Sequence, residues 1–166
     1  MLYGMKTNVQ IKQQNRRSLA MRITPAGDVV VCIPNWMKPS HRKVQQFIKQ
    51  GLAKLEPHLP AERQEPRHTE DEIRALVRKW SDAMGADVGR VQIREMTRKW
   101  GSCSSRRNIT LNASLRYLPL HLVEYVVVHE LAHLFIFDHS PAFWAKVGEF
   151  LPDYATFERE LDTYRV

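Results

Sequence analysis

Three residues in the second half of the chain have the types and the spacing of a metal site. They lie in the apolar stretch YVVVHELAHLFIFDHSPAFW, residues 125–144, which we expect to be largely helical and buried. Residues four apart share one face of a helix, so His129 and His133 can present their imidazoles to one Zn²⁺ ion. Glu130 projects to the side, where it can reach water at the ion without binding the ion itself. Burying these groups without partners costs several kcal/mol, and a bound ion would supply a partner.

A catalytic zinc site keeps one position open for water and takes a third ligand from the protein. We expect this ligand to be His139, ten residues after His129, because the turn-forming residues 138–141 should end the helix and return the chain toward the pair. The alternative for His139 is a surface histidine at a helix end, stabilised by the helix dipole. The rival third ligands are carboxylates on the following helices: Glu149, Asp153 and Glu158.

This set of residues suits hydrolysis by a metal-activated water. Zn²⁺ lowers the pKa of its water toward about 7 and polarises a substrate carbonyl. Glu130 would take the proton from the water and later deliver it to the leaving amine. The group that stabilises the oxyanion is left open, with Tyr125, Tyr154 and Arg116 as candidates.

The N-terminal part of the chain is predicted to contain strands and a helix. Residues 8–34 alternate in the β pattern around the turn sequence PAGD, and a helix with one apolar face should follow from residue 39. The charged and proline-rich residues 56–70 are the best linker candidate. The next helix is predicted over residues 70–84, with Thr69 as its N-cap.

A second β region precedes the histidine stretch. The segments RVQIREM and NITLNASL alternate apolar and polar residues, and residues 100–103 between them are predicted to form a turn-like link. From Pro119 the chain should be helical to about Phe137, and further helices should begin near Ser140 and Asp153. The layout is therefore α+β.

The charge is unevenly distributed along the chain. The formal net charge is +7, yet residues 1–60 contain 10 Lys and Arg against 2 Asp and Glu, whereas residues 121–166 contain 3 against 8. The basic part could attract a nucleic acid or another polyanion, and the alternative is a solvated basic surface. The sequence has neither the apolar run of a membrane span nor a signal peptide, and Cys32 and Cys103 form no pair motif. We therefore expect a cytoplasmic protein with free thiols.

The motifs together resemble a known family. The stretches RKWGSCSSRRNITLNASLRYLP, YVVVHELAHL and DHSPAFW are similar to the YgjP-like metal-dependent hydrolases, which are related to the SprT and WLM zincins. The resemblance implies a zincin-like α+β fold: a small mixed sheet beside the HExxH active-site helix, with an N-terminal β region and C-terminal helices. It also implies a single metallopeptidase domain over residues 1–166. Within that domain, residues 1–60 would form a basic β-hairpin and helix, and residues 68–166 the zincin core.

The resemblance further implies that His129, His133 and His139 bind one Zn²⁺ ion and that Glu130 is the base. The function that follows is a zinc-dependent hydrolase of metallopeptidase type, acting on a peptide or protein. One alternative is a metal-dependent nucleoside triphosphate pyrophosphohydrolase, although the chain has no glycine-rich phosphate loop. Another is a DNA-associated SprT-like protease, or a nucleic-acid-binding protein whose structural metal would have four protein ligands.

Three residues outside the metal set are candidates for substrate binding: Asn112, Arg116 and Tyr154. The alternating segment TLNASL could form a sheet edge above the cleft, where an extended peptide would add as a strand. Asn112 would then hold either the substrate or a turn. Phe143 and Trp144 are expected to pack the following helix against the active-site helix.

Overall fold

The computed structural model describes residues 8–24, 26–55 and 64–164. The chain divides into two compact units, Met1–Glu65 (unit 1) and Pro66–Val166 (unit 2). This division falls within the linker that the sequence indicates. The interpretation of both parts as subregions of one domain stays a prediction.

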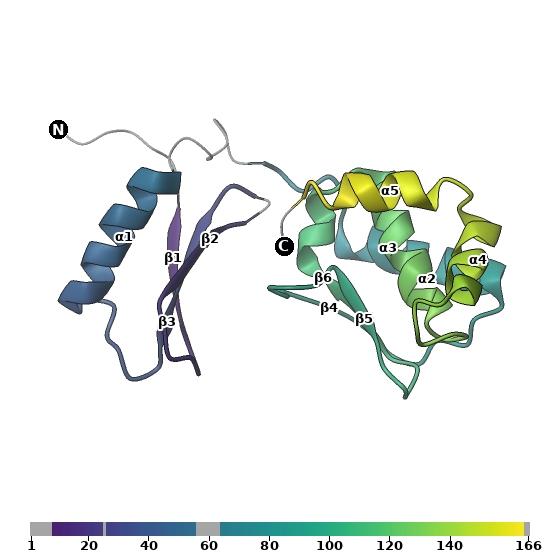
Figure 1. The fold of residues 1–166 in the computed structure, drawn as a ribbon, viewed down its shortest axis with the longest axis horizontal. Helices are drawn as coiled ribbons and strands as arrows, with labels where there is room; N and C mark the ends of the chain where they lie inside the picture. The colour runs from purple at the N-terminus through teal and green to yellow at the C-terminus, as the bar shows by residue number, and fades with distance from the viewer. Residues whose placement is uncertain (1–7, 25, 56–63, 165–166) are drawn as a thin grey trace. The chain divides into compact units, whose positions relative to one another are not determined.

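Unit 1 is a three-stranded sheet with one helix packed on it. Its elements are β1 (Val9–Gln14), β2 (Ala20–Ile23), β3 (Val29–Pro34) and α1 (Arg42–Leu55). The strand order is β1-β3-β2, with β3 parallel to β1 and antiparallel to β2 (Figure 1). The predicted apolar face of α1 packs on β3, whose six residues are all buried. The strands and the helix face are confirmed, but the helix begins at Arg42, because residues 39 and 40 form a turn before it.

The described part of unit 2 contains a second small sheet, four α-helices and one 3-10 helix. In chain order, its elements are α2 (Glu70–Met84), β4 (Val91–Arg94), β5 (Gly101–Cys103), β6 (Ile109–Asn112), the 3-10 helix η2 (Ala113–Tyr117), α3 (Leu120–Ala132), α4 (Pro141–Phe150) and α5 (Tyr154–Leu161). Within the described residues, none of the helices combines the length and the apolar character needed to cross a bilayer.

The predicted start of α2 is confirmed by its capping interactions. The Thr69 hydroxyl accepts the Glu72 backbone N–H at 3.2 Å, and the Glu72 carboxylate accepts the Thr69 backbone N–H at 2.7 Å. This reciprocal pair satisfies two N–H groups that a helix end leaves without partners. The helix ends at Met84 and is capped by Gly85, whose φ of 63° is in the left-handed region that glycine adopts without strain.

The sheet of unit 2 corrects two sequence-based predictions. The strand order is β4-β6-β5, so β6 is central and β5 is an edge (Figure 1). The link predicted at residues 100–103 contains the strand β5, and the predicted edge segment TLNASL is divided between β6 and η2. The strand ends at Asn112 because its side chain accepts the Ser114 backbone N–H at 3.0 Å and caps the 3-10 helix. Alternation of apolar and polar residues does not distinguish a central strand from an edge strand.

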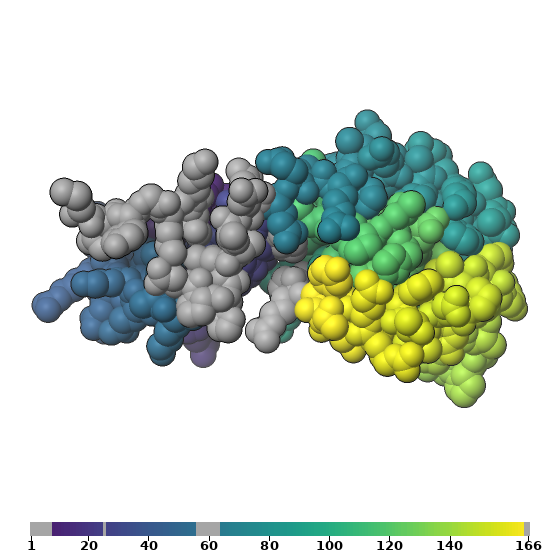
Figure 2. Space-filling view, turned by 90° about the horizontal axis from the view of Figure 1, so that it is seen from above, coloured from purple at the N-terminus to yellow at the C-terminus, as the bar shows by residue number. Residues whose placement is uncertain are grey.

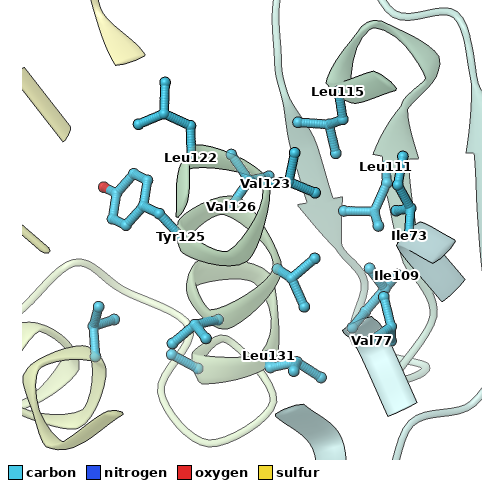
Figure 3. Close-up of a cluster of buried hydrophobic side chains, with 14 of the residues drawn as sticks. Ile73, Val77, Ile109, Leu111, Leu115, Leu122, Val123, Tyr125, Val126 and Leu131 are labelled. Carbon is cyan, nitrogen blue, oxygen red and sulfur yellow. The ribbon is translucent and has the colours of Figure 1, made fainter. Parts of the chain in front are cut away.

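The helix α3 is the centre of the core of unit 2. Nine of its 13 residues are buried, as expected from its apolar sequence. Figure 3 shows Val123 on the side of Leu111 and Leu115, whereas Leu122 and Tyr125 point to the other side of the helix. On the face shown in Figure 2, green atoms of α3 lie between teal atoms of α2 and yellow atoms of α5. The helix is thus covered by elements from both ends of the unit.

The end of α3 differs from the prediction. The helix ends at Ala132 and not near Phe137, and His133 is its C-cap. After it the chain turns more tightly, with the Leu134 N–H donating to the Leu131 carbonyl at 3.0 Å. Such i to i+3 bonds commonly close a helix and satisfy its last carbonyl groups. The early end allows the chain to turn back toward the helix within a few residues.

Candidate metal centre

The structure brings the three predicted histidine ligands together. Ligand atoms of His129, His133 and His139 all lie within 4.8 Å of one another. The Nε2 atoms of His129 and His139 are 3.1 Å apart. Among the described residues, these three form the one group suited to a metal ion, and it includes none of the rival carboxylates Glu149, Asp153 and Glu158.

Each imidazole is positioned by a different part of the chain. His129 is on the last turn of α3, His133 caps that helix, and His139 precedes α4, whose first residue is Pro141. The fully buried Phe143 of α4 contacts all three rings, with centroid distances of 4.9, 4.5 and 4.8 Å. The sequence analysis expected Phe143 to pack two helices together and did not predict that its ring would lie against the imidazoles.

Local hydrogen bonds and burial prepare the histidines to act as metal ligands. The Nδ1 of His133 lies 3.2 Å from the Ile136 carbonyl, so Nδ1–H donates to it and the Nε2 lone pair is available to an ion. Burial, followed by the neighbouring histidines, lowers the pKa of His129 to about 3. Burial also lowers the pKa of His133. Both rings are therefore neutral near pH 7, as metal binding requires, and imidazole nitrogen is a suitable ligand for Zn²⁺.

Glu130 is a buried carboxylate beside the three imidazoles. Only 6% of the residue is exposed, and Oε2 has no hydrogen-bond partner among the residues that the structure describes. Burial raises the pKa of Glu130 to about 8, and the positive charge of Lys99 opposes that shift. A carboxyl group whose pKa lies near neutrality can both accept and release a proton at physiological pH.

The imidazoles and Glu130 line a pocket of about 380 Å³. The wall is formed by the strand β5 and the segment before it, by α3 and the residues that follow it, and by the end of α5: Lys99, Trp100, Gly101, Ser102, Cys103, Tyr125, Val126, His129, Glu130, His133, Phe137, His139 and Leu161. Asn112, Arg116 and Tyr154, the three candidates for substrate binding, are not among these residues. Of the three oxyanion candidates, Tyr125 alone is part of the wall.

Asn112 supports the pocket from within the protein. It is fully buried, and its side-chain amide donates to the carbonyls of Met96 at 3.0 Å and Lys99 at 2.9 Å. These bonds hold the segment that leads into β5. The geometry therefore favours the turn-holding alternative for Asn112 over contact with a substrate.

The other two substrate-binding candidates also make contacts elsewhere. The Arg116 Nε donates to the His68 carbonyl at 3.2 Å. The Tyr154 ring stacks on Trp144 at a centroid distance of 5.2 Å, and Trp144 in turn stacks on His139 at 5.7 Å. Tyr154 therefore supports a predicted ligand through an intermediate aromatic ring.

Gly101 of β5 leaves the space that the Glu130 side chain occupies. A Cβ at this position would lie 2.5 Å from Glu130 Oε1 and 2.6 Å from Glu130 Cγ, closer than side-chain atoms can approach. Even Ala would therefore displace the carboxylate. The sequence analysis did not identify this glycine as a site residue, since the contact joins segments that are distant in the sequence.

We predict that Gly101→Ala lowers kcat/KM for the metal-dependent hydrolysis expected from the sequence by about 100-fold, because a displacement of about 1 Å can have that effect. Zinc content should be unchanged, since the three atoms nearest to the added Cβ all belong to Glu130 and none belongs to a histidine. The matched control is Gly148→Ala, where the added Cβ would meet Tyr154 at an ordinary 3.4 Å. Steady-state kinetics and metal analysis of both variants provide the test, and wild-type activity of Gly101→Ala would show that the carboxylate position is not important.

Comparisons with known proteins agree with this geometry. A family model described as "YgjP-like, metallopeptidase domain" matches residues 60–164. One similar solved structure is the crystal structure of the metallopeptidase zymogen abylysin of Pyrococcus abyssi. Its sequence is 27% identical to this chain, and the TM-score is 0.51 over 55% of this chain and 92% of that chain. The corresponding zymogen jannalysin of Methanocaldococcus jannaschii is 19% identical, with a TM-score of 0.50 over 55% of this chain and 94% of that chain, and supports the fold alone. Among curated proteins, none matches the chain.

Proposed function

Because the chain belongs to the YgjP-like metallopeptidase family, we propose that it is a zinc-dependent peptidase with Glu130 as its general base. His129, His133 and His139 would hold the ion. The observation that carries this proposal is the convergence of three imidazoles beside a buried carboxylate in an open pocket. A structural zinc site takes four protein ligands, whereas three leave room for water and substrate.

In this proposal the protein's own residues bind the substrate and move the proton. When bound, a zinc ion supplies Lewis-acid activation of water and of the scissile carbonyl. Glu130 takes a proton from the attacking water at its carboxylate and delivers it to the nitrogen of the leaving amine. Burial leaves only 6% of Glu130 exposed, and an environment with little solvent strengthens the electrostatic interactions of the carboxylate with the reacting groups.

The edge strand β5 is the element best suited to bind a peptide main chain. It pairs with β6 on one side only, and all three of its residues line the pocket. An extended substrate would add to this edge through backbone hydrogen bonds, the role that the sequence analysis gave to the segment TLNASL. Tyr125 is the candidate for oxyanion stabilisation because burial raises the pKa of its phenol, which therefore stays protonated and able to donate.

Metal removal tests the proposed activity directly. The purified chain should cleave an unfolded protein such as reduced casein, lose this activity with 1,10-phenanthroline, and regain it with one equivalent of Zn²⁺ but not with Mg²⁺. Peptide fragments are measured by mass spectrometry. Hydrolysis of nucleoside triphosphates without any peptide cleavage would instead favour the pyrophosphohydrolase alternative.

A further inference from the structure

Most of unit 1 lies outside residues 60–164, the region that the family model matches. The connections after β1 and β3 lie together at one end of this unit. The two strands are parallel, so their C-terminal ends are adjacent. The Asn35 N–H donates to the Gln14 carbonyl at 3.0 Å, and the Gln13 side-chain amide donates to the Met37 carbonyl, also at 3.0 Å. Figure 1 shows that α1 begins at this same end, the lower end of unit 1 in that view.

This end, which we call the basic end, collects five positive charges: Arg16, Arg17, Lys38, Arg42 and Lys43. Within the described residues, none of these side chains forms an ion pair. The one acidic residue between residues 8 and 55 is Asp28, which precedes β3 and therefore lies at the opposite end of that strand. Among the residues that the structure describes, the positive charge of the basic end thus has no acidic partner.

The positive charges at the start of α1 do not stabilise this helix. Arg42 and Lys43 occupy the first turn of this helix, which contains no acidic residue. Cations at a helix N-terminus oppose the helix dipole and destabilise the helix by several tenths of a kcal/mol. Their position is explained better by an anionic partner than by folding.

The connection that carries Lys38 also carries an exposed aromatic side chain. Trp36, in the connection between β3 and α1, is 71% exposed, more than any other large hydrophobic residue that the structure describes. It is not part of the hydrophobic core of unit 1. An indole face in water beside positive charges is a platform on which an unpaired base can stack, with the adjacent phosphates near the cations.

We propose that the basic end binds single-stranded nucleic acid, with Trp36 stacking on a base and the five cations contacting phosphates. This surface is independent of the metal centre and of the peptidase proposal. A membrane surface fits less well, because the exposed side chains of α1 are Lys, Arg and Gln apart from Ala53, with no apolar stripe to enter a bilayer.

Fluorescence anisotropy with a labelled 12-nucleotide oligothymidine or oligouridine tests the proposal on the full chain. Trp36→Ala should weaken binding by about 5- to 150-fold, the effect of losing one stacked base. Trp36→Phe should restore most of the affinity, which a folding defect would not allow. Arg17→Gln should reduce the slope of log K against log salt by about 0.7, as expected for one lost phosphate contact on a single strand.

The matched control is Lys54→Gln, which removes the same charge from an exposed site in the last turn of α1. Affinity and salt slope should stay at wild-type values in this variant. Equal effects of Arg17→Gln and Lys54→Gln on affinity and salt slope would show that binding depends on the total positive charge and not on the basic end, and would overturn the proposal. Unchanged binding by Trp36→Ala, or tighter binding to phosphatidylglycerol vesicles than to the oligonucleotides, would overturn it as well.

Discussion

Replacing Glu130 with glutamine is expected to lower kcat/KM for peptide hydrolysis by about 100- to 10,000-fold, the usual contribution of a general base. Glutamine has nearly the same shape, so the contact with Gly101 and the pocket wall should be kept. Its amide cannot take up a proton from water. The zinc content should not change, because the group of ligand atoms is formed by the histidines alone.

The same variant should be at least as stable as the wild type. Burial raises the pKa of Glu130 in the folded protein from 4.5 to about 8, so the folded state binds a proton more tightly than the unfolded state. In the zinc-free protein, the stability that this proton provides is lost as the pH rises from about 4.5 to 8. Glutamine stays neutral and avoids this loss, as is common when a functional group is replaced at a site built for activity.

Kinetics with a quenched fluorescent peptide, elemental analysis and thermal unfolding together measure these effects. Glu124→Gln is the matched control, because Glu124 is on the same helix and pairs with Lys79 at the surface, 2.9 Å away. Its activity should remain close to that of the wild type. If Glu130→Gln kept full activity, or lost its zinc together with its activity, Glu130 would not be the base.

Replacing His139 with alanine is expected to remove both zinc binding and peptidase activity. His139 is the most exposed of the three histidines, so its loss leaves no large cavity in the core. Loss of a supporting outer-shell group weakens metal binding by about 10- to 100-fold, and loss of a direct ligand should exceed that range. Zinc affinity measured by competition with a chromophoric chelator checks this expectation.

The control for His139→Ala is His121→Ala, the same substitution on α3. His121 faces Glu160 at 2.8 Å and is not part of the metal group. The His121→Ala variant should bind zinc as the wild type does. Wild-type zinc affinity in His139→Ala would contradict the three-histidine site and favour one of the carboxylates Glu149, Asp153 or Glu158 as the third ligand.

The sequence alone determined the features that depend on neighbours along the chain. The spacing of His129 and His133 on a helix is local, and so is the capping pair that starts α2 at Thr69. Strand and helix patterns in unit 1 were likewise readable from the alternation of residue types. The position of His139 near the pair followed from the turn signals after it, although the helix ends earlier than predicted, at Ala132.

Only the tertiary structure decided how distant segments meet at the site. In the folded protein β5 is an edge strand, Gly101 lies against Glu130, and the Phe143 ring packs on three imidazoles. It also buried Asn112, whose role the sequence left open between binding a substrate and holding a turn. Strand order and packing across the core depend on backbone hydrogen bonds and on shape, and the order of polar and apolar residues carries little information about either.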